Sequence, residues 1–124
     1  MPRILIVEDD AATAWALEEG LSDEGYEIVA VDSAEKALAA FKKRPADLVI
    51  TDLRLPRMDG ATLLRRLRAR GNGKQAAFIV VTAYGTDETL RQLLESGVHA
   101  CFPKPFQMER LRKGVEAALK VKVA

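Results

Sequence analysis

Several residue types that whole classes of protein depend on are scarce in this chain of 124 residues. The one cysteine, Cys101, cannot form a disulfide within the chain, and with a single histidine, His99, it argues against a zinc site. No apolar run approaches the ~20 residues that a membrane-spanning helix needs. The net charge of +1 favours neither direct nucleic-acid binding nor attachment to a membrane surface. We therefore expect a cytoplasmic protein whose chemistry uses oxygen and amine side chains.

The composition that remains is that of one ordinary globular domain. Hydrophobic residues make up 48% of the chain and charged residues 30%. A chain of this length can bury one core, and it has no linker, repeat or low-complexity segment. We therefore treat residues 1–124 as a single domain.

Short apolar runs alternate with longer amphipathic segments, a pattern that predicts strands alternating with helices. Asp10 and Ser33 are suited to cap the first two helices, and Gly60 is placed in a loop. The expected strands cover residues 3–7, 27–31, 47–51, 77–82 and 98–102. The expected helices cover residues 10–23, 33–43, 61–70, 86–96 and 107–121.

Continuous rather than alternating apolar runs indicate strands that are buried on both faces. Residues 27–31 instead alternate enough to be an edge strand. Five strands, each followed by a helix, predict an α/β fold with one parallel sheet between two helical layers. Of the common doubly wound arrangements, the flavodoxin-like order 2-1-3-4-5 uses five strands. In that order, strands 1 and 3 flank the switch point where ligands bind.

Carboxylates follow those two strands directly. Asp52 ends the run Leu48–Thr51, and Glu8, Asp9 and Asp10 follow the first strand. A carboxylate at the tip of a buried strand is costly unless it is used. Hard oxygen ligands of this kind suit Mg²⁺, and one Asp is left to act as a nucleophile.

Two further polar residues complete a set that suits phosphoryl transfer. Glu8, Asp9 and Asp52 together carry three negative charges, which one Mg²⁺ and Lys104, just after the fifth strand, would balance. Thr82, at the end of the fourth strand, supplies a hydroxyl for phosphoryl oxygens. Taken alone each residue has a plainer role, such as a helix cap for Asp10, but four strand ends deliver them to one edge.

Two other functions fit the residues less well. A phosphohydrolase of the haloacid-dehalogenase type needs a second Asp two residues after its nucleophile, where this chain has Arg54. A flavin or nucleotide binder needs a first loop rich in Gly, Ser or Thr to hold phosphate, and the acidic residues 8–10 would repel it.

Four segments in order carry a resemblance to a known family. They are Ile-Leu-Ile-Val-Glu-Asp-Asp (4–10), Asp-Leu-Val-Ile-Thr-Asp-Leu-Arg-Leu-Pro-Arg-Met-Asp-Gly (47–60), Val-Val-Thr-Ala-Tyr-Gly (80–85) and Phe-Pro-Lys-Pro-Phe (102–106). With these spacings the whole chain resembles a receiver domain of the response regulators of two-component signalling, including the single-domain proteins of phosphorelays. The resemblance implies a signalling switch that catalyses its own phosphorylation, rather than a metabolic enzyme.

The resemblance also implies a role for each site residue. Asp52 would take a phosphoryl group from a phosphohistidine on a histidine kinase or a histidine phosphotransfer protein. Glu8 and Asp9 would hold Mg²⁺ together with Asp52 and the backbone carbonyl of Arg54, with Asp9 as the more direct acidic ligand. Thr82 and Lys104 would bind the phosphoryl oxygens, and the Lys104–Pro105 peptide bond is expected to be cis. The chain would be a monomer that dimerises weakly, if at all, on phosphorylation.

One departure from the family pattern affects how the expected switch would work. Cys101 stands where the family usually has an aromatic switch residue, and strand alternation turns Phe102 to the other face. Tyr84 either replaces that ring in part or makes a plain contact at the rim, so a signal would pass through loop 83–87 and the helix after it. Because Arg54 and Tyr84 are bulky, we expect slow self-dephosphorylation.

No effector is expected within these residues. We expect either a single-domain regulator or a receiver cut from a longer protein, and its output partner would be an effector domain or a downstream protein. A docking module that is never phosphorylated stays open, and Mg²⁺ dependence separates it from a true receiver. We expect Trp15 to be exposed and the arginines of helix 61–70 to form a solvated face.

Overall fold

The computed structural model describes residues 1–69, 76–83 and 86–123. Strands and helices alternate throughout these residues, as the apolar pattern predicts. The strands are β1 (Arg3–Val7), β2 (Glu27–Val31), β3 (Leu48–Thr51), β4 (Ala77–Thr82) and β5 (Ala100–Pro103). The helices are α1 (Ala11–Ser22), α2 (Ala34–Lys43), α3 (Gly60–Ala69), α4 (Asp87–Glu95) and α5 (Met108–Val123).

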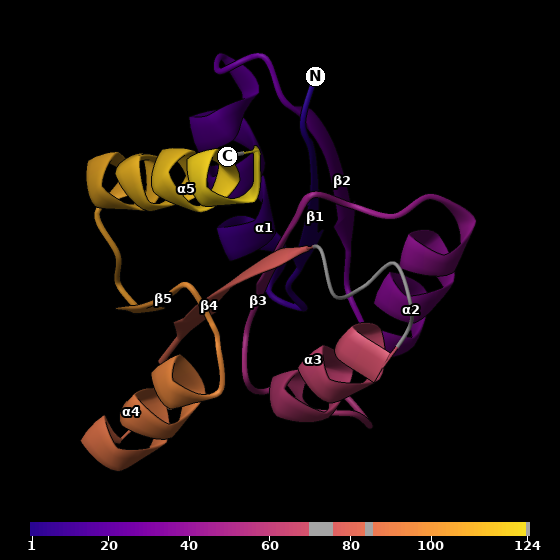
Figure 1. The fold of residues 1–124 in the computed structure, drawn as a ribbon, viewed down its shortest axis with the longest axis vertical. Coiled ribbons are helices and arrows are strands. Elements are labelled where there is room, and N and C mark those ends of the chain that lie inside the picture. The colour runs from indigo at the N-terminus through magenta and orange to yellow at the C-terminus, as the bar shows by residue number, and fades with distance from the viewer. Residues whose placement is uncertain (70–75, 84–85, 124) are drawn as a thin grey trace.

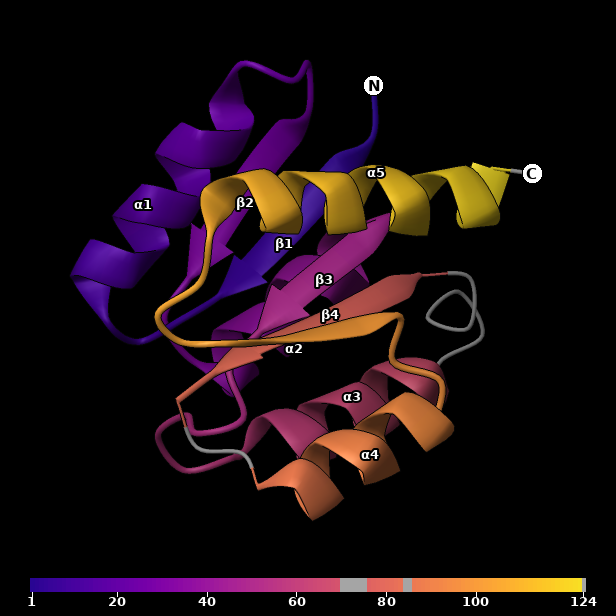
Figure 2. The same ribbon diagram turned by 90° about the vertical axis from the view of Figure 1, so that its left-hand side faces the viewer.

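The strands form one parallel sheet in the order β2-β1-β3-β4-β5, which confirms the predicted fold. Helices α1 and α5 lie on one face of this sheet, and α2, α3 and α4 lie on the other (Figures 1 and 2). In this order β1 and β3 are neighbours near the middle of the sheet, so the residues that follow them meet at one edge.

The sheet separates two apolar cores. In β1, Ile4 and Ile6 pack with residues of α1 and α5, whereas Leu5 and Val7 pack with residues of α2 and α3. Strands β3 and β4 alternate in the same way. Because successive side chains point to opposite faces and both faces are covered, the strands read as continuous apolar runs.

Side-chain caps fix where the first helices begin. The carboxylate of Asp10 accepts a hydrogen bond from the backbone N–H of Thr13 at 3.3 Å, and Ser33 Oγ accepts one from Lys36 N–H at 3.2 Å. Both caps confirm the prediction, because these side chains satisfy amides that a helix leaves without a partner in its first turn.

Most element boundaries lie within two residues of the sequence prediction, and differences occur at α3, β5 and α5 among others. Helix α3 begins at Gly60 instead of after it, since Asp59 Oδ1 accepts the N–H of Thr62 at 2.7 Å and acts as the cap. Strand β5 begins at Ala100 instead of residue 98, because Val98 N–H donates to Leu93 O at 3.2 Å and so still belongs to the end of α4. The last helix covers 108–123 instead of 107–121.

Gly60 brings the start of α3 unusually close to the strand that ends in Asp52. A Cβ atom at position 60 would lie inside van der Waals contact of the Asp52 carbonyl oxygen and 3.0 Å from Leu53 Cα. Gly60 N–H also donates to Leu53 O at 2.8 Å. Glycine is therefore required here by the close approach of two backbone segments.

Gly60→Ala should lower the free energy of unfolding by about 2 kcal/mol, because the new methyl group meets backbone atoms that cannot move aside. The change runs against helix propensity, which favours Ala over Gly. Urea unfolding measures the loss. Gly25→Ala is the control: its surroundings are open but its φ is 78°, so it should cost only about 1 kcal/mol. A Gly60→Ala protein as stable as the parent would contradict the close approach.

Candidate functional site

The sheet itself places Glu8 and Asp52 at one edge. Glu8 N–H donates to Val31 O at 3.0 Å, and Asp52 N–H donates to Val7 O at 3.2 Å. Both residues thus extend the parallel ladder one step beyond their strands, β1 and β3. Hydrogen bonds to the neighbouring strands therefore hold the backbones of both site residues in place.

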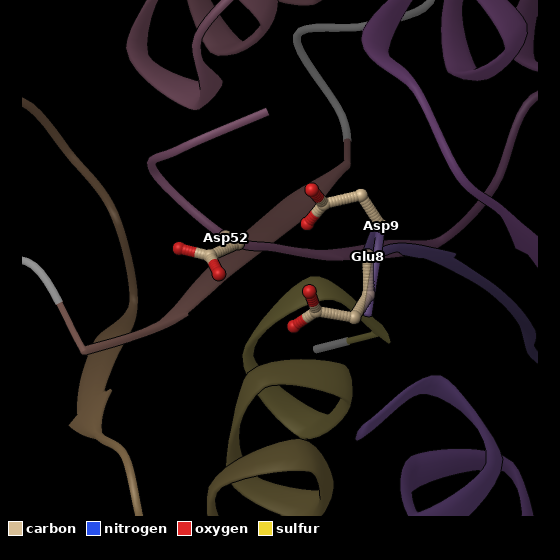
Figure 3. Close-up of side chains that lie close together, drawn as sticks. All are labelled: Glu8, Asp9 and Asp52. Carbon is tan, nitrogen blue, oxygen red and sulfur yellow. The ribbon is translucent and has the colours of Figure 1, made fainter. Parts of the chain in front are cut away.

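Three carboxylates share this edge. Oxygen atoms of Glu8, Asp9 and Asp52 lie within 4.8 Å of one another. Figure 3 shows the side chains of Glu8 and Asp9 extending toward the side on which Asp52 lies. Glu8 is 3% exposed and Asp52 is 4% exposed, whereas Asp9 is open to solvent. The cluster predicted from the sequence is therefore formed, and the solvent side is Asp9.

Lys104 joins the two buried carboxylates. Its Nζ donates to Glu8 Oε1 at 2.5 Å and to Asp52 Oδ2 at 2.8 Å. The peptide bond from Lys104 to Pro105 is cis, and Lys104 N–H donates to Thr82 O at 3.0 Å. Lysine from the end of β5 thus reaches acids that follow β1 and β3.

The second oxygen of each buried carboxylate has a backbone partner. Asp10 N–H donates to Glu8 Oε2 at 3.1 Å, and Arg54 N–H donates to Asp52 Oδ1 at 3.2 Å. Both groups therefore accept one lysine and one amide hydrogen bond. These contacts offset much of the cost of removing two charges from water.

The surroundings shift the pKa values of two site residues upward. Burial raises the pKa of Glu8, and the hydrogen bond from Lys104 lowers it by less. Burial alone would lower the pKa of Lys104, but its hydrogen bonds to Asp52 and Glu8 outweigh this and raise it above the ordinary lysine value. The Lys104 ion pairs hence stabilise the fold fully below that ordinary value, and their contribution is lost as the pH rises through the folded-state pKa.

An open pocket of about 560 Å³ lies over the carboxylates. Its lining residues are Glu8, Asp9, Asp10, Thr13, Asp52, Arg54, Leu55, Pro56, Ala83 and Lys104. Thr82 ends β4 and is 3% exposed, and it does not line this pocket. Tyr84 lies outside the described residues. The structure therefore brings together five of the predicted residues (Glu8, Asp9, Asp52, Arg54 and Lys104), with Thr82 behind them.

Cys101 and Phe102 point to opposite faces of β5, as alternation predicts. Cys101 packs against the core under α2 and α3, while Phe102 packs toward α5, where a Cβ at Gly114 would lie 2.8 Å from its ring. Burial raises the pKa of the Cys101 thiol, which disfavours the reactive thiolate. Phe102 therefore does not place its ring on the face of the sheet that Cys101 occupies, and that face has no aromatic switch residue from β5.

Other residues singled out from the sequence lie away from the pocket. Trp15 is 64% exposed on α1, as expected, and His99 is exposed at the start of β5, the end opposite Lys104. Arg65 and Arg66 are exposed on α3, as predicted, but Arg68 is only half-exposed. Its guanidinium lies 4.9 Å from the Phe78 ring centre and donates to Ser96 O at 2.5 Å. Arg70 lies outside the described residues.

Sequence reasoning missed two contributors to the site. The sequence pattern predicts a loop at Gly60. An Asp followed by Gly before an apolar run also fits the start of a helix that lies close to another backbone segment. Arg57 has a φ of 67°, and no pattern in the sequence predicts that conformation in an arginine.

In the described residues, no helix is both long and apolar enough to cross a membrane.

Lys104→Met should lower the free energy of unfolding at pH 7 by about 2 kcal/mol, because Glu8 and Asp52 lose their shared cation. The variant should also raise the pKa of Glu8 further, so its deficit relative to the parent should shrink as the pH falls and Glu8 takes up a proton. Titration of side-chain carboxyl carbons by NMR follows Glu8 directly. Lys36→Met, which removes an exposed ion pair to Asp32, should leave Glu8 unchanged. If the pKa of Glu8 were the same in the parent, Lys104→Met and Lys36→Met, the pairing of Glu8 with Lys104 would be refuted.

Comparison with known proteins agrees with the geometry. Residues 4–116 match the family described as the response regulator receiver domain. Sporulation initiation phosphotransferase F of Bacillus subtilis is 32% identical over 120 residues, which cover 97% of this chain and 95% of that protein. A solved receiver domain protein (CheY-like) from Methanospirillum hungatei has a TM-score of 0.90 at 30% identity, covering 98% of this chain and 96% of the other.

Longer proteins match as well. The two-component response regulator PhoP of Pseudomonas aeruginosa is 35% identical over 118 residues, which cover 95% of this chain, yet this chain spans only 52% of PhoP. The match therefore extends over nearly the whole chain, in relatives of similar length and in part of longer ones. With its parallel sheet order and its acidic edge, the chain belongs to the response regulator receiver domain family.

Proposed function

We propose that Asp52 accepts a phosphoryl group from a phosphohistidine of a histidine kinase or a histidine phosphotransfer protein. The observation that carries this proposal is Lys104 Nζ, which bridges Asp52 and Glu8 at 2.8 and 2.5 Å beside the exposed Asp9. A nucleophilic carboxylate, a fixed cation and further oxygen ligands are what phosphoryl transfer needs. Residues 1–124 would act as one receiver domain.

The donor set suits Mg²⁺. Three carboxylates offer oxygen atoms within 4.8 Å, and hard oxygen ligands are those that Mg²⁺ prefers. We assign Asp9, Asp52 and the carbonyl of Arg54 as direct ligands. Within the acidic pair that follows β1, the exposed Asp9 would be the more direct ligand, because both oxygens of the buried Glu8 already accept hydrogen bonds. When bound, Mg²⁺ supplies positive charge that offsets the phosphoryl oxygens.

Transfer replaces one bond to phosphorus by another. An oxygen of Asp52 attacks the phosphorus atom, a P–O bond forms, and the bond from phosphorus to the donor's imidazole nitrogen breaks with its electron pair left on that nitrogen. Before transfer, Lys104 Nζ donates to Asp52 Oδ2. After transfer the negative charge lies on the phosphoryl oxygens, and Lys104 would donate to one of them instead. Thr82, buried behind the pocket, would donate its hydroxyl to one of those oxygens once the site is loaded.

The switch that follows would differ from the usual aromatic coupling. Cys101 is small and packs into the core beneath α2 and α3. No aromatic ring therefore stands at position 101 to turn toward the site on phosphorylation. The signal would instead pass from Thr82 through residues 83–87 to α4 and then to an effector domain or a downstream protein. Arg54 lines the pocket and would hinder water, which favours slow self-dephosphorylation. A kinase partner that uses ATP would act on the chain in the cytoplasm, which is the localisation that we propose.

Phosphorylation can be tested with acetyl phosphate as a small-molecule donor. Intact mass should rise by one phosphoryl group when Mg²⁺ is present, and the gain should vanish with EDTA and in Asp52→Asn. Asp59→Asn is the matched control, since Asp59 follows the same strand but caps α3. No mass gain in any condition would favour the alternative that the chain is a docking module that is never phosphorylated.

Asp9→Asn separates metal binding from folding. Without Mg²⁺ the variant should be more stable than the parent by of order 1 kcal/mol, because one like charge leaves a cluster of three. Mg²⁺ should raise the melting temperature of the parent but not of the variant, since only a ligand that binds the folded state stabilises it. Glu19→Gln, an equal change of charge on α1 and outside the acidic cluster, should keep the full response to Mg²⁺. Equal Mg²⁺ responses in the parent and Asp9→Asn would remove Asp9 from the site.

A further inference from the structure

The loop of residues 53–59, between β3 and α3, forms part of the pocket wall. Arg54, Leu55 and Pro56 line the pocket from this loop. One residue further on, Arg57 has a φ of 67°, and among the described residues it is the non-glycine residue with a positive φ. A side chain in this region costs of order 1 kcal/mol, so surrounding contacts must hold the residue there.

The inner side of the loop is fixed by its own backbone and by the core. Gly60 N–H donates to Leu53 O at 2.8 Å, and Met58 N–H donates to Pro56 O at 2.7 Å. The side chains of Leu55 and Met58 pack against the core under α2 and α3. These contacts close the loop but do not by themselves join its outer side to another element.

The outer side is joined to α2 by an ion pair. Arg57 Nε donates to Glu35 Oε2 at 3.1 Å, and Glu35 stands in the first turn of α2. Glu35 Oε1 is buried and has no hydrogen-bond partner in the described part of the chain. A hydrogen bond from the Glu35 backbone amide and the hydrogen bond from Arg57 together lower the pKa of the Glu35 carboxyl, so Arg57 helps to keep this side chain charged. We call this pair, Glu35 and Arg57, the loop tether.

We infer that the loop tether positions the pocket wall, and above all the backbone of Arg54, for the divalent cation. This inference rests on the proposed function, since it concerns the same Mg²⁺ site. The tether touches neither the cation nor the phosphoryl group, so Glu35 and Arg57 are positioning residues. Their effect passes through the three residues before Arg57, whose backbone is set by where Arg57 is held. Groups that orient metal ligands from outside are known to change metal affinity, and an exposed pair should do so modestly.

The variants must separate the ion pair from the backbone conformation. Arg57→Asn tolerates a positive φ but loses the tether, and Arg57→Lys keeps the positive charge that Glu35 requires. Glu35→Gln removes the tether from the other side without touching the loop. Lys36→Gln is the control, because it breaks the Lys36–Asp32 pair at 3.0 Å, which is exposed to a similar degree at the same end of α2.

Mg²⁺ affinity is measured by titration calorimetry, and amide exchange of Met58 and Gly60 is measured without metal. Glu35→Gln and Arg57→Asn should each weaken Mg²⁺ binding about threefold to fivefold and speed exchange of both amides. The double variant should be no weaker than the single ones, Arg57→Lys should regain most of the affinity, and Lys36→Gln should match the parent.

Three outcomes would overturn the inference and can be told apart. If the parent binds Mg²⁺ and the tether variants bind it equally well, the pair is only a surface contact, even if urea unfolding shows a loss of stability. If the parent binds no Mg²⁺, the proposed function fails and the inference falls with it. A loss of affinity without faster exchange of Met58 and Gly60 would also reject positioning, since it would point to a purely electrostatic effect.

Discussion

The contact on which the site depends is the one between Lys104 Nζ and two buried carboxylates. Glu8 and Asp52 sit on neighbouring strands with almost no access to water, and each would be costly to bury alone. A single lysine from a third strand end pairs both of them. The pairing is incomplete, because Asp9 adds a third negative charge at the solvent side. The fold thus keeps an uncompensated charge at one edge, which lowers its stability and prepares the edge to receive a cation.

Parallel pairing explains why such a site could be recognised from the sequence. Apolar runs located the strands, and residues directly after a parallel strand all arrive at the same edge, so Asp52 and Glu8 could be joined before any coordinates were known. The caps Asp10 and Ser33 were equally visible, because a capping side chain acts within four residues of its own position. Local signals and the rule for parallel strands therefore carried most of the fold and the acidic cluster.

The features that the sequence does not predict depend on contacts between segments that are distant in the chain. Gly60 reads as a loop residue until the Asp52 backbone is seen against it, and Arg68 reads as a surface charge until Phe78 and Ser96 are placed beside it. The start of β5 shifted because Val98 closes α4 rather than opening the strand. Such outcomes depend on packing across the fold, which periodicity along one segment does not encode.

The two cores on either side of the sheet touch different helices. Ile4 and Ile6 belong to the core with α1 and α5, and Leu5 and Val7 belong to the core with α2 and α3. Substitutions in separate cores share few neighbours, so their effects on folding should add. Over evolutionary time, one helical layer can therefore diverge to suit a new partner while the other keeps its packing. The residues of the acidic edge lead into helices of both layers, so changes in either layer constrain them.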